Sequence, residues 1–241
     1  MAQPLDPGVP ELDFEALYRN PSSYPIPRST TVPWDTGEPQ PVIVEWETAG
    51  QIRGDVLDVG CGLGENAIYL AQRGHRVVGL DTAPTAVAQA AERARRRGAP
   101  VQLMVADATG GHWVEVYQGR FDTVVDSALL HCLPVGDRAR YAAALHRVLR
   151  PGGRLQLLCI SDTGPEGLPG PVQITEAELR AAFAAGWKIL DLQRARYTAG
   201  FTAEQLTEFA TASGLPAPHQ LETDEKDRVY LPFWRMSAER L

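Results

Sequence analysis

From residue 41 onward, two kinds of apolar pattern alternate along this chain. Short continuous apolar runs predict buried strands, and stretches with apolar residues every three or four positions predict amphipathic helices. The predicted strands are residues 56–59, 76–80, 101–105, 121–126, 155–160, 187–192 and 229–236. The predicted helices are residues 14–19, 42–49, 66–72, 84–98, 137–149, 175–186 and 202–213.

This strict alternation of strand and helix predicts an α/β fold with a mainly parallel sheet and helices on both faces. Ligands of such sheets bind beyond the carboxyl ends of the strands, where the strand order reverses. We therefore expect the functional residues in the loops that follow the predicted strands.

The N-terminal segment has a different character. Nine of the 19 prolines lie within the first 41 residues, which excludes regular structure for most of it. A long irregular stretch in a compact protein is either a lid or a disordered tail, and Tyr18, Tyr24 and Trp34 favour a lid. Because 241 residues suit one large α/β domain, we expect residues 1–40 to form an N-terminal segment and lid, and residues 41–241 a single domain.

Charge and composition exclude several classes of function. The net charge of −7 argues against a nucleic-acid partner, and the basic run at Arg93 and 95–97 is expected to remain solvated at the end of a helix. No apolar run approaches the ~20 residues that span a bilayer, and the N-terminus does not resemble a signal peptide, so we expect a cytoplasmic protein with no membrane partner. The three cysteines form no CxxC pair, so neither a metal site nor a disulfide framework is expected.

Three glycines, Gly60, Gly62 and Gly64, directly follow the strand 56–59 and precede a helix. Glycine lets the backbone approach a ligand closely, and the free amides of the next helix favour a negative group. That group is a pyrophosphate in dinucleotide enzymes and a methionine carboxylate in adenosylmethionine. The GxGxG spacing, together with Asp58 as an acceptor for the methionine ammonium, favours adenosylmethionine.

Four acids, Asp58, Asp81, Asp107 and Asp126, end four successive predicted strands. The position of Asp81 is where an acid meets ribose hydroxyls, and Asp107 can accept from an adenine amino group. Any one of them is explained as an ordinary polar strand end. The set of four predicts a cradle for a nucleoside cofactor.

The segments VLDVGCGLGENAIYLA, VVGLDTAPTAV, VADAT, FDTVVDSALLHCL and LRPGGRL resemble the successive motifs of class I S-adenosylmethionine-dependent methyltransferases, over about residues 40–160. The resemblance implies a Rossmann-like, seven-stranded sheet with an antiparallel last strand. It also implies S-adenosyl-L-methionine as cofactor and S-adenosyl-L-homocysteine as product. The cofactor would lie among Asp58, Gly60, Gly62, Gly64, Asp81, Thr82, Asp107, Ala108 and Asp126.

Two outer segments, VPWDTGEPQP and GPVQITEAELRAAF, resemble the thiopurine, thiol and halide methyltransferase group. The first is also similar to bacterial methyltransferases that cap small heteroaromatic toxins. In those enzymes the N-terminal segment covers the cofactor and its tryptophan packs near the sulfonium. The resemblance assigns that place to Trp34 and the neighbouring contacts to Asp35 and Gly37.

His131 follows the fourth strand, five residues after Asp126, near where the methyl group should point. An imidazole there can orient the acceptor or take its proton, so His131 and Asp126 are the candidate catalytic residues. The alternative is a hydrogen-bonded histidine that packs the loop. The candidates for contacts with the acceptor are Tyr24, Trp113, Tyr197 and Phe201.

The sequence therefore predicts methyl transfer to a small molecule, an aromatic or heterocyclic N, O or S nucleophile. In-line transfer from a sulfonium needs alignment and water exclusion, and no metal. A nicotinamide-dependent oxidoreductase and a non-catalytic adenosylmethionine-binding module are the alternatives. The acceptor, its reacting atom and the oligomeric state are left open.

Overall fold

The computed structural model describes residues 13–23, 32–162, 173–212, 214, 218 and 221–241. Within these residues seven strands form one sheet, in the order β3-β2-β1-β4-β5-β7-β6. The strands are β1 (Asp55–Val59), β2 (Arg76–Asp81), β3 (Val101–Val105), β4 (Phe121–Ser127), β5 (Leu149–Ile160), β6 (Trp187–Thr202) and β7 (Arg228–Arg240). Only β7 runs antiparallel to its neighbours, β5 and β6. The predicted fold class is confirmed.

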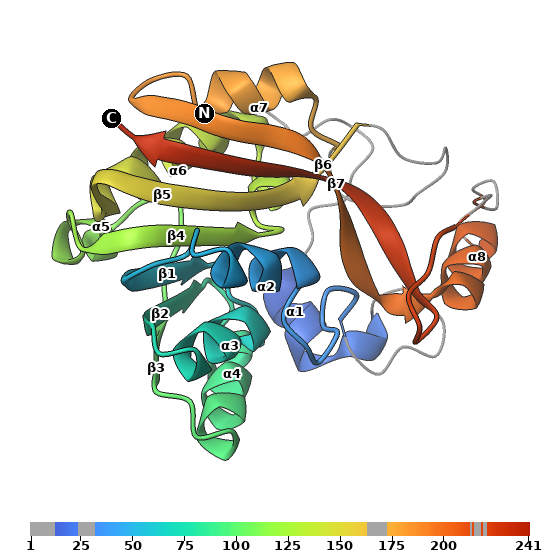
Figure 1. Ribbon diagram of the computed structural model, residues 1–241. Helices are drawn as coiled ribbons and strands as arrows, with labels where there is room; N and C mark the ends of the chain where they lie inside the picture. Colours follow the sequence, from blue (N-terminus) through green and yellow to red (C-terminus); the bar gives the residue numbers. More distant parts are fainter. Residues whose placement is uncertain (1–12, 24–31, 163–172, 213, 215–217, 219–220) are drawn as a thin grey trace.

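Helices cover both faces of the sheet (Figure 1). The α-helices of the described residues are α1 (Phe14–Arg19), α2 (Pro41–Thr48), α3 (Glu65–Gln72), α4 (Pro84–Arg96), α5 (His112–Val116), α6 (Val135–Val148), α7 (Glu176–Ala182) and α8 (Ala203–Ala212). All but the five-residue α5 were predicted from the sequence, and α7 begins at a capping box formed by Thr175 and Glu178. Within the described residues, no helix is long and apolar enough to cross a membrane.

Two apolar cores lie on opposite faces of the sheet, because successive side chains of a strand point to opposite sides. On β4, Val124 belongs to the core beneath α5, α6 and α7, while Val125 belongs to the core beneath α2, α3 and α4. All five residues of β1 are buried. A central parallel strand covered on both faces is therefore mainly apolar, and in β1 only Asp55 and Asp58 interrupt the apolar residues.

β6 and β7 extend past the carboxyl ends of the parallel strands and curve toward α8 (Figure 1). β6 was expected to end at residue 192 but continues to Thr202. The sequence hid this extension because its exposed residues include two arginines that stack on aromatic rings of β7. The Arg194 guanidinium lies 3.5 Å from the ring centroid of Trp234. A small core that includes Phe201 and Phe209 joins the extension to α8.

The segment 32–40 crosses this extension and is fastened to it by backbone contacts. The Gly200 amide donates to the Pro33 carbonyl at 2.6 Å. The Gln40 side chain exchanges two hydrogen bonds with the backbone of Thr198, at 2.9 and 3.1 Å. Residues 32–40 therefore hold a defined position above the carboxyl edge of the sheet.

Arg93 fastens the same segment from the other side. Its guanidinium donates to both carboxylate oxygens of Asp35, at 2.9 and 2.8 Å, and to Glu65 at 2.6 Å. The expectation that the whole basic run is solvated is therefore wrong for Arg93, whose side chain is only 20% exposed. A helix-end arginine gives no sequence signal for a partner 58 residues away.

Candidate active site

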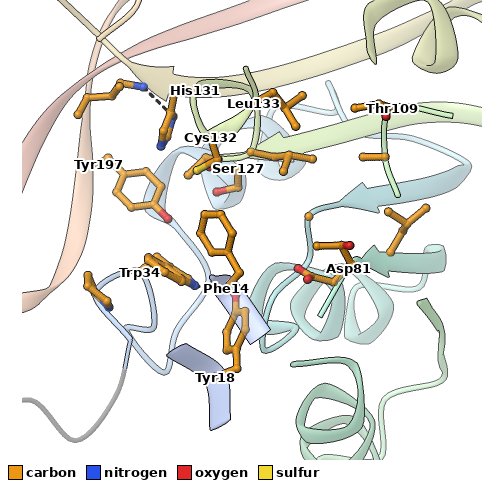
Figure 2. A pocket seen from close by; sticks show the side chains of 18 of the residues that line it. Phe14, Tyr18, Trp34, Asp81, Thr109, Ser127, His131, Cys132, Leu133 and Tyr197 are labelled. Carbon is orange, nitrogen blue, oxygen red and sulfur yellow. Dashed lines mark hydrogen bonds between the residues drawn. The ribbon is translucent and has the colours of Figure 1, made fainter. Parts of the chain in front are cut away.

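A cavity of about 350 Å³ lies at the carboxyl ends of the parallel strands. The strand-end loops, α1, the segment 32–40 and the β6–β7 extension enclose it (Figure 2). Its lining includes six of the predicted site residues, namely Trp34, Gly60, Asp81, Thr82, Asp107 and Ala108. It also includes His131, Tyr197 and Phe201 from the predicted acceptor end. The two predicted halves of the site therefore share one cavity.

Asp81 and Asp107 lie at one end of the cavity. Asp81 accepts hydrogen bonds from the amides of Gly62, at 2.8 Å, and Ala83, at 2.9 Å, while burial raises its pKa. One oxygen of Asp107 accepts from both the amide and the hydroxyl of Thr109 at 2.8 Å. These bonds fix both carboxylates on the cavity wall.

The glycines of the first loop leave no room for side chains. A Cβ on Gly60 would lie 2.9 Å from the Leu129 side chain, and one on Gly62 would lie 2.7 Å from the Tyr18 hydroxyl. Both glycines have positive φ values, of 69° and 52°. Gly64 instead allows close approach of α3 to Ala90 of α4, at 3.0 Å from its Cβ position. All three glycines line a second, smaller hollow beside the main cavity.

Asp58 is 1% exposed and is not part of the cavity lining. Burial raises its pKa to about 7, and one carboxylate oxygen has no hydrogen-bond partner among the described residues. A buried acceptor without a donor is costly unless a ligand supplies one. This orphaned oxygen behind the glycine loop fits the ammonium group of a methionine moiety.

Asp126 has a structural place instead of a catalytic one. It is fully buried and accepts hydrogen bonds from the amides of Leu129, at 2.8 Å, and Leu130, at 3.2 Å, and from the Tyr141 hydroxyl, at 2.7 Å. These donors occupy both of its oxygens, and the residue does not line the cavity. The geometry therefore does not support Asp126 as a cofactor or catalytic residue. Its carboxylate orders the loop that carries His131.

His131 lies at the other end of the cavity, buried at 6% exposure. Its Nδ1 accepts a 3.1 Å hydrogen bond from the Ile160 amide, and its ring meets the edge of Phe233 with centroids 5.5 Å apart (Figure 2). Burial, with a smaller effect of the Arg138 cation, lowers the pKa of the imidazole to about 3. The ring is therefore neutral at physiological pH.

Aromatic side chains form the wall around His131. Tyr197 stacks on Phe233 with centroids 4.2 Å apart and planes 13° from parallel, and both line the cavity with Phe14 and Phe201. Phe14, Phe233 and Leu231 were not predicted, because nothing in their local sequence distinguishes them from core residues. Tyr18 was predicted only as part of a lid, yet its hydroxyl lies against the glycine loop.

Two predicted acceptor contacts lie elsewhere. Trp113 is buried in a core, where its Nε1 donates to the carbonyls of Asp107, at 2.8 Å, and Gly110, at 2.9 Å. It does not line the cavity, so it is not an acceptor contact in this structure. Tyr24 lies outside the described residues. The fold and site together define a Rossmann-like protein with one cavity at its strand ends, acidic at one end and aromatic at the other.

Comparisons with known proteins agree with this class. The family described as "Methyltransferase domain" matches residues 56–153. The 2-heptyl-1-hydroxyquinolin-4(1H)-one methyltransferase of Mycobacteroides abscessus is 38% identical over 208 residues, covering 83% of this chain and 89% of that protein. A solved structure described as "Conversion of a Disulfide Bond into a Thioacetal Group during Echinomycin Biosynthesis" is 33% identical, with a TM-score of 0.75 and coverage of 94% and 91%.

A third structure, the 1,6-didemethyltoxoflavin-N1-methyltransferase of Burkholderia thailandensis, is 22% identical and shares the fold, with a TM-score of 0.60 and coverage of 100% and 93%. The chain belongs to the class I S-adenosylmethionine-dependent methyltransferases. It is an enzyme that uses S-adenosyl-L-methionine to methylate a small molecule.

Proposed function

We propose that the methyl acceptor is a flat heteroaromatic molecule that carries an O, N or S nucleophile. One observation carries this proposal: a single cavity joins Asp81 and Asp107 at one end to His131 and the stacked rings of Tyr197 and Phe233 at the other. A largely apolar pocket with a few convergent polar groups is typical of small-molecule sites. The 38% identical relative, by its name, methylates a hydroxyquinolinone.

The residues at the cofactor end match the polar groups of S-adenosylmethionine. Asp81 would accept from the ribose hydroxyls, Asp107 from the adenine amino group and Asp58 from the methionine ammonium, while Gly60 and Gly62 keep the loop open. S-adenosylmethionine supplies the activated methyl group, so the protein's task is to align the acceptor and exclude water. The segment 32–40 would act as the lid that excludes water, held by Gly200 and Arg93.

The aromatic wall would position the acceptor. A planar ring placed against Tyr197 and Phe233 gains stacking as well as burial, and each such pair contributes about 0.5–1.5 kcal/mol. Phe201 of β6 and Leu231 of β7 also line the cavity. The acceptor end is therefore built mainly by the strand extension, which lies outside the stretch that matches the methyltransferase family.

The test is transfer from labelled adenosylmethionine to a panel of hydroxyquinolines, thiopurines, phenols, aliphatic thiols and halide, followed by mass spectrometry. We expect a bicyclic heteroaromatic compound to be methylated in preference to phenols, aliphatic thiols and halide. Phe233→Ala should raise KM for that acceptor more than KM for adenosylmethionine, while Tyr230→Phe, outside the cavity, should change neither. Transfer to halide or aliphatic thiols alone would contradict the proposal.

Two sequence-based expectations remain predictions: a cytoplasmic location and the absence of a nucleic-acid partner. Cell fractionation tests the first, and an electrophoretic mobility assay tests the second.

A further inference from the structure

The hydrogen bond between Ile160 and His131 fixes which ring nitrogen carries the proton. The Ile160 amide donates to Nδ1 at 3.1 Å, so Nδ1 must hold a lone pair. A neutral imidazole has one proton, which therefore lies on Nε2. In Figure 2 the free end of the ring points into the cavity, toward Tyr197. His131 thus presents a hydrogen-bond donor to the acceptor, and it has no lone pair there to receive a proton.

The surroundings keep this ring neutral. The groups that ionise on the neighbouring elements are Asp126 on β4, Cys159 on β5, Asp137 and Arg138 on α6, Tyr197 on β6 and Cys132 in the same turn. Burial is the main cause of the lowered imidazole pKa, and the Arg138 cation is the second. Arg138 is itself 4% exposed, with Nε and one Nη unpaired among the described residues. A second cation beside that buried guanidinium is disfavoured.

Burial raises the pKa of Asp126 to about 7, but this carboxylate does not line the cavity, and Leu129, Leu130 and Tyr141 occupy both of its oxygens. The other described side chains that ionise at the acceptor end are not poised as bases near neutral pH. Burial raises the pKa of Cys132 to about 12, and it also raises the pKa of Tyr197 well above that of an exposed tyrosine. The Asp137 carboxylate is paired with Arg140 at 3.1 Å. Asp81 and Asp107 lie at the cofactor end of the cavity, where backbone amides hold them. The proton of the acceptor therefore has no described recipient within the chamber.

We propose that the acceptor enters as its anion, having already lost its proton to water, and that Nε2–H of His131 holds it in line for methylation. This inference rests on the proposed function. It narrows the acceptors to compounds whose reacting group ionises unaided near neutral pH, such as N-hydroxy heteroaromatics, enolised heterocyclic ketones and heteroaromatic thiols. Simple phenols, alcohols and aliphatic thiols are poor substrates because they remain protonated.

Electrons and charge balance without an enzyme base. A lone pair of the acceptor anion forms the new bond to the methyl carbon. The carbon–sulfur bond breaks, and its electron pair stays on sulfur, which becomes a neutral thioether. No proton moves in this step. The negative acceptor and the positive sulfonium offset each other in a chamber of low polarity, so the pair is less costly to bury than either ion alone.

The first test measures kcat/KM against pH for a series of ring-substituted acceptors whose own pKa values differ. The proposal expects each profile to rise about tenfold per pH unit and to level off at the pKa of that acceptor. The plateau should therefore move from one acceptor to the next. A rise through one common pKa for all acceptors would reveal an enzyme base and overturn the proposal.

Two variants of His131 distinguish a hydrogen-bond donor to the acceptor from a side chain that only supports the loop. His131→Gln can place an amide N–H near the position of Nε2, whereas His131→Asn places its amide oxygen near that of Nδ1, toward Ile160. We expect His131→Asn to fold normally but to lose about ten- to hundred-fold in kcat/KM, and His131→Gln to retain most activity. The reverse order would show that His131 only packs the loop. His112→Asn, at an exposed site, is the matched control.

A third test needs no acceptor. Long-range ¹H–¹⁵N NMR of the ¹⁵N-histidine-labelled protein should show His131 protonated at Nε2 only, without change between about pH 5 and 9, the signal being assigned by its loss in His131→Asn. Formation of an imidazolium near pH 6 would overturn the proposal even if methylation of heteroaromatics is found. An unchanged neutral ring without any heteroaromatic transfer would instead count against the proposed function.

Discussion

The indole nitrogen of Trp34 donates a 2.7 Å hydrogen bond to the hydroxyl of Tyr18, beside the loop of Gly62. The two rings meet edge to face, with centroids 5.9 Å apart. This bond ties the segment 32–40 to α1, two parts of the chain that enclose the cavity from the same side (Figure 2). It also fixes the orientation of the Trp34 ring on the cavity wall.

From this orientation we predict that Trp34 distinguishes a positive sulfonium from a neutral thioether. A cation over an aromatic face gains about 0.5–2 kcal/mol. Trp34→Leu should therefore weaken binding of adenosylmethionine about 2- to 30-fold more than binding of adenosylhomocysteine. Isothermal titration calorimetry with both ligands checks this, and the neutral ligand serves as the control. Equal weakening of both would mean that Trp34 contributes burial alone.

Gly200 sets the distance between the lid and β6. A Cβ at this position would lie 2.6 Å from the Asp35 carbonyl oxygen and 3.1 Å from that of Pro33, and neither backbone atom can move alone. We expect Gly200→Ala to displace the segment 32–40, to raise KM for adenosylmethionine about tenfold and to lower stability by about 1–3 kcal/mol. Steady-state kinetics and thermal unfolding measure the two effects.

Gly136 provides the control for that substitution. It lies within α6, and a Cβ there would meet no atom within 4 Å. Gly136→Ala should leave KM unchanged and stabilise the protein by no more than about 1 kcal/mol, because alanine has the higher helix propensity. Should both alanine variants behave alike, the lid contact at Gly200 does not control cofactor binding.

Ala128 has a left-handed backbone conformation, with φ of 84°, in the loop between Asp126 and His131. An L-residue other than glycine is strained there by about 1–2 kcal/mol. The Ala128 amide donates to the Leu158 carbonyl at 2.9 Å, and Asp126 holds the two following amides. Ala128→Gly should therefore stabilise the protein by about 1 kcal/mol and raise Tm by roughly 2–4 °C, as read by calorimetry. An unchanged or lower Tm would show that the loop is not strained.

The fold and the cofactor end were largely predictable because they depend on local patterns. Asp81 and Asp107 each follow an apolar run, and parallel strands bring their carboxyl ends to one edge. The same pattern placed Asp126 among the site residues, but its side chain does not line the cavity. Sequence locates the end of a strand, but it does not show that the carboxylate turns back to Leu129, Leu130 and Tyr141.

The acceptor end was less predictable because distant segments build it. Phe14 precedes the lid, and Phe233 lies near the end of the chain, yet both line the cavity together with His131. The β6–β7 extension that brings Phe233 there is half exposed and rich in arginine, so its hydrophobic period is weak. Likewise, the sequence placed His131 correctly after β4, but only the Ile160 bond reveals which of its nitrogens faces the acceptor.

Asp55 lies at the opposite edge of the sheet from the cavity and is the centre of an ion cluster with Arg76, Arg120 and Arg150. The hydrogen bond from Arg76 lowers the pKa of this buried carboxylate most. Its charge therefore stabilises the fold at any pH above its unfolded-state pKa of about 4, and that stabilisation is lost as the pH falls below 4.

Asp55→Asn should therefore cost about 2 kcal/mol at pH 7, because the arginines are partly exposed and can be solvated once the carboxylate is gone. Between about pH 4 and pH 2 the wild type should lose this advantage, so the unfolding free energies of the two proteins converge. Urea unfolding at several pH values measures the difference. Asp162→Asn breaks only the exposed pair with Arg194 and should cost less than about 0.5 kcal/mol at any pH. A difference between wild type and Asp55→Asn that persists at pH 2 would show that packing, not charge, is the contribution of Asp55.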